Sequence, residues 1–301
     1  MVRVVPPLVS VIIPTFNRWP MVGAAVESVL AQSFPDFELI VVDDGSTDGT
    51  AGRLARLRSR LRILSTPRKG VSAARNTGVS QSLGHYLAFL DSDDLWRPGK
   101  LARQTAFMVE HPEVRICQTE EIWIRNGIRV NPKAVHRKPS GDIFARSLDL
   151  CLVSPSAVMM TRELFQRLGG FDETLPVCED YDLWLRVAAK EPVPLIAEAL
   201  VIKRGGHADQ LSRSMWGMDR YRVRALQKIL RAGLKGWRRA AALQVLRRKV
   251  AVLANGARKR GREREADDFE GLLDEFKQER TDVRERDSRI RPGQGLSPAN
   301  A

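Results

Sequence analysis

The sequence predicts an α/β fold, in which a mostly parallel sheet is flanked by helices and followed by a basic helical extension. Short apolar runs alternate with segments whose apolar residues recur at helical spacing, which is typical of βαβ units. Polar residues gather directly after the runs, where ligands bind in open α/β sheets. The four runs are residues 8–13, 37–42, 61–65 and 86–90.

The first run lies in the opening stretch MVRVVPPLVSVIIPTF. Its hydrophobicity is that of a signal peptide, but Pro6, Pro7 and Pro14 interrupt it and no small-residue cleavage site follows. We therefore interpret it as a buried first strand. Helical spacing follows it, in Val22, Val26 and Val29 among others.

Beyond residue 112 the alternation is weaker. A strand and hairpin are expected with Asn126-Gly127 at the turn, because this dipeptide favours a two-residue hairpin turn. A short helix is expected over 141–152, and a strand and helix that end at Gly169-Gly170. A further helix begins at Glu179, and one or two helices should cover 222–254.

The charge divides the chain into three parts. The whole chain has 301 residues and a formal charge of +13, of which residues 1–212 carry +2, residues 213–262 carry +15 and residues 263–301 carry −4. We predict a globular domain over 1–210, a basic helical extension over 211–285 and a disordered tail over 286–301.

Cysteine usage and hydropathy indicate a cytoplasmic protein. Cys117, Cys151 and Cys178 are odd in number, far apart and free of any C-x-x-C pair, which fits a reducing compartment. No apolar run approaches the roughly 18 residues that a membrane-spanning helix needs.

The stretch AFLDSDDLW, residues 88–96, places three carboxylates within four positions after an apolar strand. So many like charges beside a hydrophobic segment are unfavourable unless a positive group lies among them. Asp91 and Asp93 form a D-x-D pair that can reach one hard divalent cation, Mg²⁺ or Mn²⁺. The alternative is a solvated turn.

Six motifs stand in the order and spacing of family 2 glycosyltransferases of the GT-A fold, which the chain resembles over roughly residues 8–210. The resemblance implies a Rossmann-like sheet and a nucleotide-sugar substrate. The motifs are SVIIPTFNR, QSFPDFELIVVDDGSTDGT, GVSAARNTGV, YLAFLDSDDLWRPGKL, GGFDE and EDYDLWLRV.

The resemblance also implies roles for individual residues. The turn after the first strand, which includes Phe16, would hold the nucleobase and ribose, and Asp44 would face the base. The full set expected to bind the nucleotide sugar is Pro14, Thr15, Asn17, Asp44, Arg75, Asn76, Asp91 and Glu179.

For the chemistry, the resemblance implies a metal held by Asp91, Asp93 and His207, and Asp180 as general base. A carboxylate on the far side of the sugar from the metal would accept the proton of the acceptor hydroxyl, which predicts inversion at the anomeric carbon. For Asp180 the alternative is a helix-capping acid. For His207 it is a surface histidine.

We therefore expect a metal-dependent inverting glycosyltransferase with a UDP-sugar donor and a glycan or lipid-linked acceptor, acting in cell-envelope polysaccharide or glycolipid synthesis. A haloacid-dehalogenase-type phosphotransferase would also use a strand followed by D-x-D. Such sites need Thr or Val two positions after the second Asp, whereas Leu95 and Trp96 follow here. A basic nucleic-acid-binding protein would need more aromatic residues among its Lys and Arg, so no nucleic-acid partner is expected.

The basic segment 213–262 also has an apolar stripe at three- to five-residue steps. This pattern suits the anionic inner face of the cell membrane, where the protein would bind peripherally. It suits equally a helical appendage whose stripe packs on the first domain. The stripe consists of Leu226, Ile229, Leu230, Leu234, Trp237, Ala241, Leu246, Val250 and Leu253.

Overall fold

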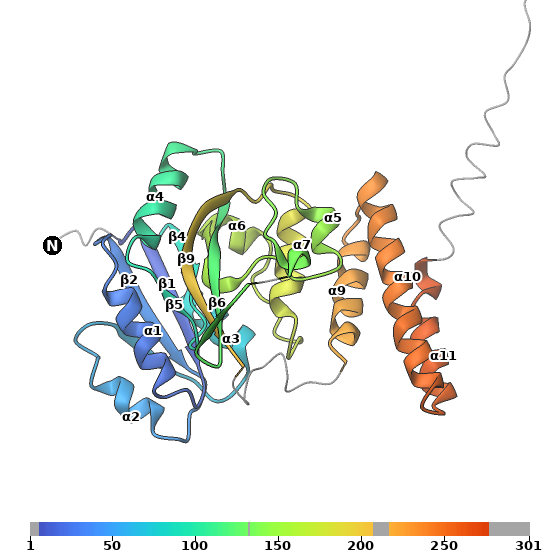
Figure 1. Cartoon of the computed structure of the whole chain (residues 1–301), viewed down its shortest axis with the longest axis horizontal. Helices are drawn as coiled ribbons and strands as arrows, with labels where there is room; N and C mark the ends of the chain where they lie inside the picture. Colours follow the sequence, from blue (N-terminus) through green and yellow to red (C-terminus); the bar gives the residue numbers. More distant parts are fainter. Residues whose placement is uncertain (1–5, 132, 207–216, 277–301) are drawn as a thin grey trace, which may run out of the picture. The chain divides into compact units, whose positions relative to one another are not determined.

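The computed structural model describes residues 6–131, 133–206 and 217–276. The chain forms two compact units, Met1–Ala242 and Leu243–Ala301. Among the described residues of the first unit, nine strands form one sheet in the order β3-β2-β1-β4-β8-β6-β9-β5, and β7 pairs with β6 (Figure 1).

One half of the sheet is parallel, as the alternation of strands and helices predicts. β1 pairs with β2 and β4, and β2 pairs with β3, all in parallel. The strands lie within or close to the four apolar runs; they are β1 Val9–Thr15, β2 Phe37–Asp43, β3 Arg62–Ser65 and β4 Tyr86–Phe89.

The other half mixes strand directions. β8 is antiparallel to both β4 and β6, β6 is parallel to β9, and β5 is antiparallel to β9. Asn126 and Gly127 both have positive φ, 49° and 78°, in the hairpin that joins β6 to β7, as expected. The strands are β5 Leu95–Trp96, β6 Ile116–Arg125, β7 Ile128–Val130, β8 Val158–Thr161 and β9 Leu195–Gly205.

Helices connect these strands. α3 packs so closely on β1 that a Cβ atom on Gly78 would lie 2.5 Å from the Ile12 side chain, so glycine is required there. The helices of the first unit are α1 Met21–Leu30, α2 Thr50–Ala55, α3 Val71–Ser80, α4 Lys100–Glu110, α5 Phe144–Ser147, α6 Arg162–Arg167, α7 Glu179–Ala188 and α9 Asp219–Arg231, with 3₁₀ turns at Ala134–His136 and Pro155–Ala157.

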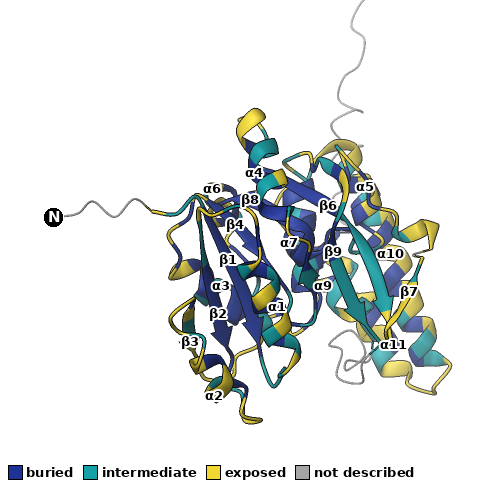
Figure 2. Ribbon diagram, turned by 60° about the vertical axis from the view of Figure 1, so that its left-hand side comes forward, coloured by how far each residue is buried: buried dark blue, intermediate teal, exposed yellow. Residues whose placement is uncertain are grey.

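Burial differs between the central strands of the sheet and the β6–β9 pair (Figure 2). Every residue of β1, β4 and β8 is buried, whereas β6 and β9 are only partly buried over much of their length. The central strands thus form a rigid core, and their ends can hold side chains in fixed positions.

Two helices, α9 Asp219–Arg231 and α10 Gly236–Arg258, cover most of residues 222–254, where one or two were expected. In α9 the apolar residues Leu226, Ile229 and Leu230 are buried, and the helix packs against α7. α10 spans Gly236–Arg258, across the boundary between the units, and the second unit also contains α11 Glu263–Gly271 and a 3₁₀ turn at Asp274–Phe276. No helix in the described ranges is long and apolar enough to cross a membrane. The tail expected to be disordered, residues 286–301, lies outside the described residues.

Candidate functional site

The loops after β1 and β2 are joined at the carboxyl edge of the sheet. Because these strands are parallel neighbours, their ends meet, and the Thr15 carbonyl accepts a hydrogen bond from Asp44 N at 2.9 Å. Asn17, with φ of 49°, donates from its backbone N to Ser46 Oγ at 2.9 Å, and its Oδ1 accepts from Thr47 N at 2.7 Å. The proposed nucleotide-binding turn is therefore one hydrogen-bonded structure.

Asp44 fixes the loop that leads into α3. It is 4% exposed, and its two carboxylate oxygens accept hydrogen bonds from Lys69 N and Gly70 N, each at 2.8 Å. Asp44 thereby links the end of β2 to the amino end of the helix that carries Arg75.

Arg75 joins two carboxylates that are far apart in the sequence. Its Nη2 lies 2.6 Å from Asp91 Oδ1 and its Nη1 lies 2.7 Å from Glu179 Oε1, and its side chain is 4% exposed. Burial works to lower the pKa of Arg75, but the charges of Asp91 and Glu179 outweigh it and raise this pKa. Arg75 brings the D-x-D loop and the first turn of α7 into one site.

Glu179 is a buried acid within this cluster. Burial, with the neighbouring charge of Asp180, raises the pKa of Glu179 to about 7, although Arg75 works in the opposite direction. Burial therefore opposes ionisation of this carboxyl group, and the contact with Arg75 favours it.

The three aspartates after β4 have different environments. Asp94 is 2% exposed, accepts hydrogen bonds from Ser156 Oγ at 2.7 Å and Arg204 N at 2.9 Å, and has a pKa raised well above its usual value by burial. The side chains of Asp91 and Asp93 are 28% and 19% exposed. Asp94 therefore supports the loop, and Asp91 and Asp93 remain accessible.

Asp91 and Asp93 are candidate ligands for a divalent cation. Two carboxylates supply hard oxygen ligands, and Mg²⁺ commonly completes its shell with waters and substrate phosphates. Within the described ranges, no group of three or more His, Cys, Asp or Glu residues could hold a metal. His207 lies outside those ranges.

Protein cations also lie among these carboxylates. Arg18 Nη1 is 3.7 Å from Asp93 Oδ2. Burial works to lower the pKa of Lys203, but negative groups, Glu121 and Asp94 foremost, outweigh it and raise this pKa. The sequence analysis missed Lys203, although a charged residue within the apolar strand LVIKRG could have indicated it.

Asp180 lies in the first turn of α7, where the helix dipole favours negative charge. Its Oδ1 accepts a hydrogen bond from Tyr181 N at 2.7 Å, and its Oδ2 accepts one from Cys151 Sγ at 3.3 Å. Burial and the charge of Asp180 raise the pKa of the Cys151 thiol well above its usual value, so the thiol stays protonated and donates.

Asn76, expected near the nucleotide or sugar, uses its amide within the protein. Its Oδ1 accepts from Phe171 N at 3.0 Å, and its Nδ2 donates to Phe171 O at 2.9 Å and to Glu173 Oε1 at 2.9 Å. The side chain therefore contacts the loop before α7, while the adjacent Arg75 contacts Asp91 and Glu179.

Comparison with known families decides the identity of this arrangement. The family described as Glycosyl transferase family 2 matches residues 10–169, more than half of the chain. The chain belongs to glycosyltransferase family 2. This membership confirms the resemblance of the motifs and favours glycosyl transfer over the phosphotransferase alternative.

Curated relatives of this family 2 chain include bacterial proteins. An uncharacterized glycosyltransferase of Rickettsia felis is 35% identical over 188 residues, 62% of this chain, and the match spans about a third (31%) of that relative. TuaG of Bacillus subtilis, a putative teichuronic acid biosynthesis glycosyltransferase by name, is 44% identical over 161 residues, 52% of this chain and 63% of that protein. WfgD of Escherichia coli, named as a UDP-Glc:alpha-D-GlcNAc-diphosphoundecaprenol beta-1,3-glucosyltransferase, is 33% identical over 60% of this chain and 69% of its own length.

Solved structures confirm the GT-A fold. Residues 1–349 of Staphylococcus aureus TarS, in complex with UDP-GlcNAc, give a TM-score of 0.65 at 22% identity, over 79% of this chain and 70% of that one. The mannosyltransferase PcManGT of Pyrobaculum calidifontis, in complex with GDP-Man and Mn²⁺, gives a TM-score of 0.58 at 21% identity. The match covers 90% of this chain and 87% of that one.

Proposed function

We propose that this family 2 chain is an inverting glycosyltransferase that moves a sugar from a nucleoside diphosphate to an acceptor hydroxyl. The observation that carries the proposal is the contact of Arg75 with both Asp91 and Glu179, which brings the D-x-D loop to the helix that carries Asp180. This contact supports the proposal, because leaving-group stabilisation and a general base would then act within one site, as a displacement reaction requires.

On the donor side, the loops after β1 and β2 would bind the nucleoside, through Pro14, Thr15, Asn17 and Asp44. Asp91 and Asp93 would hold Mg²⁺ or Mn²⁺, which when bound neutralises charge on the leaving diphosphate oxygens. The proposal extends to His207 as a further ligand. Arg18 and Lys203 would add positive charge near the same oxygens.

On the acceptor side, Asp180 would accept the proton of the attacking hydroxyl. Tyr181 N and the Cys151 thiol hold both of its oxygens by donated hydrogen bonds. These two donors fix the direction of the Asp180 carboxylate. Attack from the side opposite the leaving diphosphate inverts the anomeric carbon.

A UDP-sugar donor and a lipid-linked or glycan acceptor are the substrates we propose. The names of WfgD, which include a UDP-sugar and a diphosphoundecaprenol acceptor, and of TuaG, which include teichuronic acid, support a role in cell-envelope polysaccharide synthesis. A cytoplasmic location agrees with this role. Peripheral contact of residues 213–262 with an anionic membrane surface remains a separate proposal.

The test is protection against thermal unfolding by a panel of UDP-, GDP- and ADP-sugars, with and without Mn²⁺, because a ligand that binds only the folded state raises its stability. We expect one nucleotide class to raise the midpoint, with a larger rise in Mn²⁺. A protein that gains stability from none of them at millimolar concentration would contradict the proposal.

A further inference from the structure

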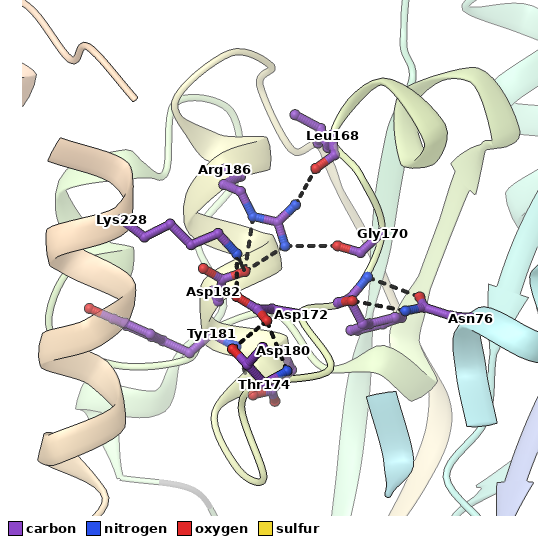
Figure 3. A network of polar contacts seen from close by, with 11 residues as sticks. Asn76, Leu168, Gly170, Asp172, Thr174, Asp180, Tyr181, Asp182, Arg186 and Lys228 are labelled. Carbon is purple, nitrogen blue, oxygen red and sulfur yellow. Dashed lines mark hydrogen bonds and ion pairs between the residues drawn. The ribbon is translucent and has the colours of Figure 1, made fainter. Parts of the chain in front are cut away.

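Lys228 of α9 contacts two carboxylates near the proposed general base (Figure 3). Its Nζ lies 2.6 Å from Asp172 Oδ2 and 3.0 Å from Asp182 Oδ2. Asp172 belongs to the GGFDE loop and Asp182 to the first turn of α7. Lys228 itself lies in the basic extension, well beyond the residues 10–169 that match the family.

The two carboxylates are parts of a continuous polar network. The Asp182 side chain is 1% exposed and also accepts a hydrogen bond from Arg186 Nε at 2.9 Å. Arg186 in turn donates to the carbonyl oxygens of Leu168 and Gly170 (Figure 3). The loop over 168–174 and the first turn of α7 are therefore fastened to each other.

The same loop is held on its other side by α3. Asn76 pairs with both backbone groups of Phe171. Figure 3 shows Asn76 and Lys228 reaching the loop and α7 from opposite sides. The loop is thus fixed between the helix that carries Arg75 and the helix that carries Lys228.

Besides Arg186 of α7 itself, the first turn of α7 has cationic anchors from two other helices. Arg75 contacts Glu179 and Lys228 contacts Asp182, and Asp180 lies between these two positions in the same helical turn. A helical turn moves as a unit, so its direction depends on both anchors. Reacting groups must be held to within a fraction of an ångström for full activity.

We propose that Lys228 is a positioning residue, which sets the direction of Asp180 toward the acceptor hydroxyl by holding the first turn of α7 and the 168–174 loop. This inference rests on the proposed function. It gives the basic extension a role in the catalytic unit that is separate from any contact with a membrane.

The test compares three variants of the full chain. Lys228→Met removes the ammonium group and keeps an unbranched apolar stem, Lys228→Arg keeps a cation, and Arg224→Met removes an exposed cation from the same helix as the matched control. We expect Lys228→Met to lower kcat by roughly 10- to 100-fold. The KM for the donor and thermal protection by the donor nucleotide should stay unchanged, because the donor loops are untouched. Lys228→Arg should recover most of kcat, and Arg224→Met should match the wild type.

A second readout does not depend on activity. Amide hydrogen exchange over 168–174 and 179–185 should be faster in Lys228→Met than in Arg224→Met, because local opening becomes easier when an anchor is lost. Equal exchange in these two variants, or equal kcat, would overturn the inference. A parallel loss of nucleotide protection would also overturn it, since it would show general destabilisation. An inactive wild type would instead contradict the proposed function, and the exchange result would still decide whether Lys228 holds α7.

Discussion

The two acidic regions of the site, the loop after β4 and the first turn of α7, are held in place by different means. The loop leaves a fully buried strand in the middle of the sheet, and Asp94 anchors it through Ser156 and the backbone of Arg204. The turn of α7 depends on cations from two other helices, Arg75 of α3 and Lys228 of α9.

Two acidic groups of one site can therefore differ in how easily a substitution elsewhere displaces them. The loop after β4 is held rigidly because it directly follows a fully buried strand. The turn depends on ion pairs with side chains of two other helices, Arg75 with Glu179 and Lys228 with Asp182. Substitutions distant from the substrate should therefore disturb the base more than the D-x-D pair.

The largest expected effect on the rate of transfer is at Asp180, the proposed general base. Asp180→Asn should lower transfer by roughly 10²- to 10⁴-fold, the usual contribution of a positioned general base. Binding of the nucleotide sugar should be retained, because the donor loops lie on other elements. Steady-state kinetics together with donor-induced thermal protection would check this. A variant that lost donor binding to the same extent as transfer would make Asp180 a donor ligand.

In the loop after β4, Asp93→Ala should lower metal-dependent transfer by roughly 10²- to 10³-fold, since it removes stabilisation of the leaving diphosphate. The fold should be intact, because the Asp93 side chain is partly exposed, whereas Asp94 is buried. The measurement is activity over a titration of Mn²⁺, with circular dichroism as the control for folding. Activity near that of the wild type would show that this loop does not hold the cation.

The next largest effect is expected on stability, at Arg75, which contacts both acidic regions. Arg75→Met should lower the free energy of unfolding by about 3 kcal/mol, because it leaves buried Glu179 without its cation. The matched control is Arg103→Met, which breaks an exposed pair with Glu198 of the same 2.7 Å length and should cost less than about 1 kcal/mol. Urea denaturation at neutral pH measures both. Equal costs would mean that Arg75 is dispensable for the fold.

A smaller effect should appear in the pH dependence of stability. Burial works to raise the pKa of Asp172, but hydrogen bonds from Lys228 and Thr174 lower it to about 2 from an ordinary 3.8. A pKa that is lower in the folded state adds stability above the ordinary value and loses it as the pH falls through the folded value.

Lys228→Met removes much of this contribution. We therefore expect it to lower the free energy of unfolding by about 1 kcal/mol near neutral pH, a figure reduced for screening by solvent at the half-exposed Lys228. The difference from the wild type should shrink as the pH falls from about 4 to about 2. Denaturation curves across this range, with Arg224→Met as the control, measure it. A difference that does not change with pH would exclude the Asp172 contact as its source.

The smallest effect concerns the basic segment. Leu226, Ile229 and Leu230 of the apolar stripe are buried and Trp237 is exposed, so we expect binding to vesicles to be mainly electrostatic. The chain should sediment with anionic but not neutral vesicles at low salt. Each of Arg224, Arg247 and Lys259 changed to Gln should weaken binding by at most about 1 kcal/mol, and salt should weaken it further. Equal binding to both kinds of vesicle, or none to either, would contradict a charged membrane contact.

The sequence by itself determined the parallel half of the sheet, because strand and helix periodicity and chain order specify βαβ units locally. It also determined the turn at Asn126-Gly127, where both residues need positive φ, and the clustering of polar loops at one edge. The D-x-D pair after the strand and the place of Asp180 at the start of a helix follow from the same local patterns.

Only the tertiary structure decided how these groups are held. Asp91, Asp93 and Asp94 look alike in the sequence, and burial beside Ser156 alone separates Asp94 from the accessible pair. The partners of Arg75, Lys203 and Lys228 could not be predicted for the same reason. An ion pair depends on which distant side chains the fold brings within a few ångströms and on how far water is excluded there, and neither quantity is encoded in local spacing.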